Sequence, residues 1–387
     1  MSETTDFSAS APPINAGVSA AAGTAIALGA AYLGAAVGWR QAALFGVGAA
    51  AGVVLYHAAF GFTSSWRALI TSGRGEGLRA QLLMLAITCV AFAPLLAAGS
   101  AFGHPLRGAI APAGVSVVVG AFLFGIGMQL GGGCASGTLY SAGGGNTRMF
   151  VTLAAFIAGA VLGAQHAAFW QALPALKPTS FAALMGPFPG LILSLGLLGA
   201  IAAATLCLER RGNERAAADS RLLRGPWPLF AGAIGLALVN VATLLLAGRP
   251  WGVVSAFQLW GAKLLAAAGV DVAHWAYWAS SPARLADLRG SLANDVTSVM
   301  DFGLMLGALC AAALAGRFAP EWRISTRALV TAVVGGLLLG YGARIAYGCN
   351  IGALFSGIAS GSLHGWLWFA AALLGNAAGT RLRSIET

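Results

Sequence analysis

Charged residues are scarce in this chain. Asp, Glu, Lys and Arg together make up 9% of its 387 residues, whereas 58% of the residues are hydrophobic. The mean hydropathy is correspondingly high, at +0.80. So few charges cannot cover the surface of a water-soluble protein of this length, and the composition therefore excludes a soluble globular fold. The chain is predicted to cross a membrane several times, with no soluble domain.

Other common signals are also missing. The five cysteines form no CxxC pair and no cluster with histidine, so neither a disulfide framework nor a bound metal or cofactor is indicated. The basic residues are spread over short loops without interleaved aromatic residues, so the net charge of +10 does not indicate nucleic-acid binding. No basic segment precedes the first apolar run, so we expect that run to stay as a helix and not to be cleaved as a signal peptide.

Apolar runs of about 20 residues, the length that spans a bilayer as a helix, recur along the chain. Lipid offers the backbone no hydrogen-bond partners, so these runs must be helices. The sequence therefore predicts an all-α polytopic membrane protein with nine or ten transmembrane helices and short re-entrant half-helices. The expected spans are residues 17–38, 42–60, 80–102, 112–131, 148–166, 186–208, 228–248, 296–316, 327–346 and 363–380.

One segment of the chain is repeated. GIGMQLGGGCASGTLYS, residues 125–141, aligns without a gap on GYGARIAYGCNIGALFS, residues 340–356, and pairs Cys134 with Cys349. A weaker similarity relates FGFTSSWRAL, which begins at Phe60, to WGVVSAFQLWG further along the chain. Such paired segments indicate a duplicated fold.

The distribution of basic residues predicts how the two copies are oriented. Five arginines occur between Arg210 and Arg224, and the positive-inside rule places this segment and the C-terminus in the cytoplasm. The helix before Cys134 then runs inward and the helix before Cys349 runs outward, so we expect an inverted repeat. The expected parts are an N-terminal tail (1–16), a first membrane repeat (17–208), a basic cytoplasmic loop (209–226) and a second membrane repeat (227–387).

The repeated glycine and cysteine segments are candidates for an anion site. Glycine lets the backbone turn sharply, and free amide groups at helix N-termini carry partial positive charge. Irregular backbone at membrane depth is tolerated where it lines a cavity, and thiols are soft, polarizable contacts. The alternative for the glycines is close helix packing. The candidate residues are Gly132, Cys134, Gly133, Ser136, Gly137, Asn146, Arg344, Gly348, Cys349, Asn350 and Gly352.

Two charged residues lie inside expected spans. Arg344 should face a cavity or a counter-charge, or else extend to the outer surface, because a cation in the membrane is costly. Asp301 could pair with Arg344, act as a proton site or simply lie at a helix end. The sequence leaves these alternatives open.

The two cysteine segments, with the stretch 250–261 and NDVTSVMDFG at 294–303, resemble the YeeE/YedE family of sulfur-transport membrane proteins. The resemblance implies an hourglass-like transporter, not an enzyme, that imports thiosulfate or a related sulfur anion across the bacterial inner membrane. It implies that Cys134 and Cys349 contact the anion in turn, and that a TusA-like sulfur carrier is a cytoplasmic partner. A third family cysteine is missing, since the matching half-helix offers only the hydroxyls of Thr63, Ser64 and Ser65.

Three other functions remain open from the residues alone. A membrane sulfurtransferase or thiol oxidoreductase would use Cys134 and Cys349 covalently. A soft-metal permease for Cu(I) is disfavoured because no Met-rich or His-rich cluster surrounds the cysteines. A structural membrane subunit would leave the repeated motif unexplained. For an anion importer, no ATP-binding motif indicates the driving force, so proton coupling, a concentration gradient and cytoplasmic consumption stay open.

Overall fold

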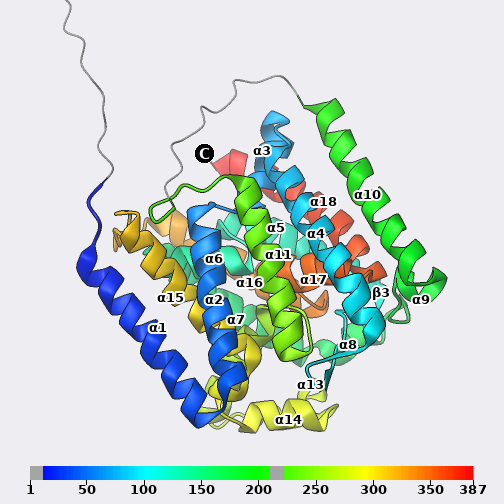
Figure 1. Cartoon of the computed structure of the whole chain (residues 1–387), viewed down its shortest axis with the longest axis horizontal. Coiled ribbons are helices and arrows are strands. Elements are labelled where there is room, and N and C mark those ends of the chain that lie inside the picture. The colour runs from blue at the N-terminus through cyan, green and yellow to red at the C-terminus, as the bar shows by residue number, and fades with distance from the viewer. Residues whose placement is uncertain (1–11, 210–221, 387) are drawn as a thin grey trace, which may run out of the picture.

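The computed structural model describes residues 12–209 and 222–386, and within these ranges the chain is almost entirely helical (Figure 1). The strands there are two-residue pairs in loops: β1 (Ser100–Ala101) with β2 (His104–Pro105), and β3 (Ala113–Gly114) with β4 (Ala175–Leu176). Most arginines of the expected cytoplasmic loop, and the start of the expected N-terminal tail, lie outside the described residues.

Ten long helices within the described ranges form the bundle. They are α1 (Ala16–Ala36), α2 (Trp39–His57), α4 (Glu76–Ala98), α5 (Val115–Gly131), α7 (Arg148–Gln165), α10 (Pro187–Leu208), α11 (Leu229–Ala247), α15 (Val296–Leu314), α16 (Thr326–Ile345) and α18 (Leu363–Glu386). In the described part of the chain, nine helical segments are long and apolar enough to cross a membrane, which confirms the predicted class. The tenth expected span, 363–380, is helical within α18 but falls outside those nine.

Shorter helices fill the connections. They are α3 (Phe62–Ser72), α6 (Ala135–Gly143), α8 (Ala167–Gln171), α9 (Phe181–Met185), α12 (Val254–Ala267), η1 (Val272–His274), α13 (Ala276–Ala279), α14 (Pro282–Arg289), η2 (Leu292–Asn294), η3 (Asn350–Phe355) and α17 (Ser356–Ala359). α6 follows α5 directly, and η3 and α17 follow α16, so each cysteine segment is a long helix, a turn and a short helix.

The centre of the bundle is built on helices that approach closely. α5 packs against α16 and α18, α16 also packs against α7, α2 packs against α15, and α4 packs against α11. A Cβ atom added to Gly342 of α16 would lie 2.4 Å from the carbonyl oxygen of Gly120 on α5, and one added to Gly335 would lie 2.1 Å from the amide nitrogen of Gly131. Because real Cβ atoms are not found at such distances, these positions require glycine, as the close-packing interpretation predicts.

Two helices lie at the periphery. In the apolar 18-residue stretch of each helix, only 11% of α1 and 17% of α10 are buried in the protein, compared with 67% of α15. Figure 1 shows α1 and α10 on opposite flanks of the bundle. Most of their apolar side chains are therefore available to face lipid.

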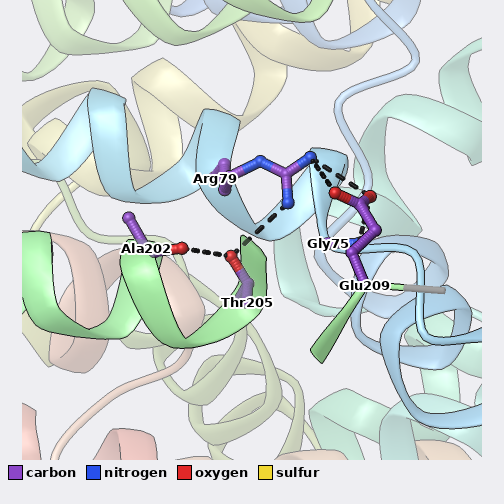
Figure 2. Close-up of polar contacts among 5 residues, drawn as sticks. All are labelled: Gly75, Arg79, Ala202, Thr205 and Glu209. Carbon is purple, nitrogen blue, oxygen red and sulfur yellow. Dashed lines mark hydrogen bonds and ion pairs between the residues drawn. The ribbon is translucent and has the colours of Figure 1, made fainter. Parts of the chain in front are cut away.

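A group of polar contacts ties the end of α10 to the start of α4 (Figure 2). The Arg79 guanidinium forms an ion pair with Glu209, with Nη2 2.9 Å from Oε2, and the same carboxylate accepts a hydrogen bond from the Gly75 amide. Thr205, also within hydrogen-bond reach of Arg79, donates to the Ala202 carbonyl. These contacts hold the peripheral helix in register with the bundle.

Candidate functional site

The first thiol lies where α5 turns into α6. Gly132 ends α5 with φ +85°, a conformation that other residues rarely adopt, and this turn leaves Cys134 as the residue that caps α6. The Cys134 Sγ accepts a hydrogen bond from the Gly137 amide at 3.4 Å and lies 3.5 Å from the Ser136 hydroxyl. Cys134 is 2% exposed. The thiol therefore occupies the N-terminal, partially positive end of a short helix.

The second thiol has the same placement. After α16, Tyr347 has φ +59° and Gly348 has φ +153°, so the chain turns sharply before Cys349 begins η3. Trp368 of α18 donates a hydrogen bond to the Gly348 carbonyl at 3.1 Å and holds this turn. Cys349 is 1% exposed, and the amides of Ile351 and Gly352 face its thiol without a capping hydrogen bond. A Cβ on Gly352 would meet nothing within 4 Å, so open space lies beside this segment.

The structure brings the two thiol segments together. α6 contacts η3, and both thiols belong to one buried core cluster. Cys349 is also close enough to Cys134 and to Asp301 of α15 for electrostatic interaction. Two cysteines that are far apart in sequence thus share one buried region in the middle of the bundle.

Several buried polar groups around this region have no hydrogen-bond partner among the described residues. Asp301 is fully buried with both carboxyl oxygens unpaired, and Asn350, next to Cys349, is fully buried with its amide oxygen and nitrogen unpaired. The hydroxyl of Thr63 at the start of α3 is also buried and unpaired. Unpaired buried polar groups are rare in native proteins and are concentrated at sites that bind something else. The sequence analysis named the Thr63 hydroxyl as part of the half-helix that lacks a thiol, and a donor role for Asn350 rested on its position beside Cys349.

The contacts of the other sequence-predicted site residues are different. Asn146 is exposed beyond the end of α6, and the hydroxyls of Ser64 and Ser65 donate to the Gly61 carbonyl in the first turn of α3. Arg344 packs against α7 and places its guanidinium carbon 4.1 Å from the ring centroid of Tyr277 on α13, a cation–π contact. Arg344 therefore contacts an aromatic ring and forms no ion pair with Asp301.

Sequence reasoning missed a buried hydrogen-bond network behind the second thiol. Ser356, at the start of α17, donates to the Trp251 carbonyl at 2.7 Å, and the amide of Asn240 on α11 donates to the Ser356 hydroxyl at 3.2 Å. The Asn240 side-chain oxygen in turn accepts from the Trp251 amide at 2.8 Å. This network fixes the second cysteine segment against α11 and the start of α12. Ser356 lies more than 100 residues from both Asn240 and Trp251, so no short motif indicates the network.

Three arginines gather at the carboxyl end of α5. Arg67 donates to the Gln129 side-chain oxygen at 2.9 Å, Arg383 donates to the Gln129 carbonyl at 3.3 Å, and Arg148 donates to the Leu130 carbonyl at 2.8 Å. Their positive charges complement the negative end of the helix dipole. They also concentrate positive charge at this end of α5.

A cavity of about 350 Å³ lies between α4, α10 and the end of α17. It is mostly apolar, and its lining includes Cys89, whose thiol lies 3.6 Å from the Ile358 carbonyl. This cavity reaches the far end of the second cysteine segment, away from Cys349 itself.

These features define a multi-pass helical membrane protein with a buried polar centre that contains two thiols, each at the start of a short helix. A sequence model of the family described as Sulphur transport matches residues 57–378, and the chain therefore belongs to that family. The resemblance to YeeE/YedE proteins is confirmed by this match and by the relatives below.

Two kinds of relative were found. The chain is 30% identical to the probable transporter YedE of Escherichia coli (strain K12) over 155 residues, which are 40% of this chain and 37% of that protein. It is 26% identical to the thiosulfate transporter TsuA of Spirochaeta thermophila over 348 residues, which are 85% of this chain and 95% of that protein. The TsuA of Escherichia coli (strain K12) is 24% identical over 355 residues, 85% of this chain and 90% of that protein. The match to YedE thus spans less than half of either protein.

Proposed function

We propose that this protein imports thiosulfate, or a closely related small sulfur-containing anion, across the bacterial inner membrane. The anion passes a constriction between the Cys134 and Cys349 segments. The observation that carries the proposal is that two buried thiols, each at the N-terminal end of a short helix, lie within electrostatic range of each other in one core cluster. The thiosulfate transporter TsuA, to which the chain is similar over 85% of its length, supports the choice of substrate.

The constriction is formed by an inverted repeat. The packing pairs support this because they are preserved when the two halves are exchanged. The exchange replaces α5 by α16 and α7 by α18, so the contact between α5 and α18 corresponds to the contact between α16 and α7. It also replaces α2 by α11 and α4 by α15, so the contact between α4 and α11 corresponds to the contact between α15 and α2. The close contacts follow the same exchange, since Gly120 meets Gly342 and Gly335 meets the end of α5. Labelling of Cys134 and Cys349 with membrane-impermeant thiol reagents from each side tests the arrangement, and access to both from one face only would contradict it.

Each segment offers contacts that suit a sulfur oxyanion. The helix N-termini supply partial positive charge, the thiols supply soft donors and acceptors for the terminal sulfur, and the Asn350 amide supplies an unpaired donor. The anion passes by weak contacts without a covalent bond, so the thiols stay reduced. The three arginines at the carboxyl end of α5 attract the anion to the cytoplasmic exit, where a TusA-like carrier receives the sulfur.

The test is uptake of radiolabelled thiosulfate by a sulfur-auxotrophic host that expresses the chain. Cys134→Ser and Cys349→Ser should each lower uptake at least about tenfold, since a loss of one contact of roughly 1.4 kcal/mol changes a rate or affinity by that factor. Cys207→Ser is the matched control, because Cys207 is exposed on α10 and should leave uptake unchanged. Wild-type uptake by both variants would refute the proposal, and a persulfide trapped on either thiol during turnover would indicate a sulfurtransferase.

A further inference from the structure

Asp301 is an ionisable residue that is buried without a hydrogen-bond partner in the described structure. It is the sixth residue of α15, about 7.5 Å along the helix from its first residue at 1.5 Å per residue. Its exposed fraction is 0%, and neither carboxyl oxygen has a hydrogen-bond partner in residues 12–209 and 222–386. The neighbouring Met300 packs in the core cluster that contains both thiols, so Asp301 lies beside the proposed constriction.

The charged and titratable groups on the neighbouring elements leave this carboxyl without a basic partner. On α15 itself, Asp295 caps the helix through the Ser298 amide and hydroxyl and is a second negative group. From η3, Cys349 is within electrostatic range of Asp301. On α2, the Arg40 guanidinium donates to the Phe102 carbonyl, and on α12 the Lys263 ammonium donates to the Leu288 and Gly290 carbonyls, so both cations are engaged elsewhere. The remaining titratable groups on α15 and the elements packed against it are Cys310 of α15, Tyr32 of α1, Tyr56 and His57 of α2, and Cys134 and Tyr140 at the start of and within α6.

A line of polar side chains leads from the surface toward Asp301. Arg249 is exposed and donates to the Thr297 hydroxyl at 3.0 Å, and Ser255 at the start of α12 donates to the same hydroxyl at 3.0 Å. Thr297 is four residues before Asp301 on α15, so both side chains lie on one face of the helix. The carboxyl is therefore buried at the inner end of a polar route that begins at the Arg249 end of the bundle.

An ionised carboxylate in this position is strongly disfavoured, because burial without a partner removes its hydration and gives nothing in return. A sulfur anion in the adjacent constriction disfavours it further by like-charge repulsion. One proton neutralises the carboxyl. A metal cation would need several ligands, and no group of three or more His, Cys, Asp or Glu side chains that could hold a metal ion is found among the described residues.

We propose that Asp301 is the proton-coupling group of the importer, an inference that rests on the function proposed above. The carboxylate takes a proton from the Arg249 side, becomes neutral and allows the anion to occupy the constriction. After the anion has left, the carboxyl releases the proton on the opposite side and is ionised again. Each anion is thus accompanied by one proton, and import responds to the proton gradient.

The full chain, purified and reconstituted in liposomes with the membrane potential clamped, tests this inference. An inward proton gradient of one pH unit should raise the steady-state accumulation of radiolabelled thiosulfate about tenfold at one proton per anion. Asp301→Asn keeps a neutral side chain of the same shape, so it should still carry thiosulfate down its own gradient but lose the tenfold response. Asp295→Asn, on the same helix and still able to cap it, should respond like the wild type.

The outcomes separate the two proposals. If the wild-type protein carries no thiosulfate at all, the proposed function fails. If it carries thiosulfate but Asp301→Asn keeps the full response to the proton gradient, or accumulation follows a sodium gradient instead, the inference about Asp301 fails and the function stands. A pH-sensitive dye inside wild-type vesicles provides a measurement that needs no variant: acidification of the interior during uptake supports co-transport, and a constant internal pH overturns it.

Discussion

Replacing Gly340 with alanine tests the close packing on which the position of the second thiol depends. A Cβ at this position of α16 would lie 2.1 Å from the carbonyl oxygen of Phe156 on α7, whereas ordinary contacts begin near 3.4 Å. The two helices must therefore separate by about 1.3 Å, the difference between these distances. The obstacle is backbone and cannot rotate away, so the cost should fall at the upper end of the usual 1–3 kcal/mol for overpacking.

The displacement should also reach the site, because Cys349 follows Gly340 by nine residues and its turn leaves directly from α16. We expect Gly340→Ala to lower the thermal midpoint of the detergent-solubilised protein by a few degrees and to lower thiosulfate uptake. The assay is size-exclusion chromatography after heating, beside radiolabelled uptake at equal expression. Gly125→Ala in α5 should behave alike, since its Cβ would lie 2.3 Å from the Ala372 carbonyl oxygen.

Gly196→Ala is the matched control, because a Cβ on this residue of the peripheral helix α10 meets nothing within 4 Å. It should leave the thermal midpoint and the uptake unchanged. The packing argument would be refuted if Gly340→Ala melted with the wild type, or if Gly196→Ala destabilised the protein equally.

Three further predictions follow from the same contacts. Ser356→Ala should destabilise the protein by about 1–3 kcal/mol, because it leaves the Trp251 carbonyl buried without its partner, and an unchanged melting curve would contradict this. A double-mutant cycle of Arg79→Ala and Glu209→Gln should give a coupling below about 1 kcal/mol, since both side chains are about a quarter exposed; a larger value would mean that this ion pair is shielded from water. Gly352→Ala should fold normally, since its Cβ enters open space, but should reduce uptake by narrowing the space beside the second thiol; full uptake would place the pathway elsewhere.

Much of the architecture could be predicted from local features of the chain. The length and apolarity of the runs at 17–38 or 228–248 are sufficient to predict α1 and α11, because a helix in lipid needs only its own backbone to satisfy its hydrogen bonds. The position of each thiol between a long and a short helix also followed from nearby glycines, since the turn at Gly132 depends on its own backbone conformation.

The partners of the site residues could not be predicted in this way. The sequence left Arg344 and Asp301 as possible partners, but the structure places Arg344 over Tyr277 and leaves Asp301 unpaired among the described residues. The hydroxyls of Ser64 and Ser65, which were expected near the anion, donate to the Gly61 carbonyl in the first turn of α3. Each of these outcomes depends on which helix faces which, and hydropathy carries no such information because all the helices are apolar.

The sequence by itself determined the class of this protein, the approximate limits of its helices and the existence of two matched thiol segments, because hydropathy, span length and glycine turns act over a few residues. Only the tertiary structure decided that the two segments share one buried region, that Ser356 is held by Asn240 and Trp251, and that Asp301 is buried without a partner in the described chain. The physical reason is that contacts between residues more than 100 positions apart are selected by the close packing of helix backbones, and the glycines that permit this packing do not specify their partners.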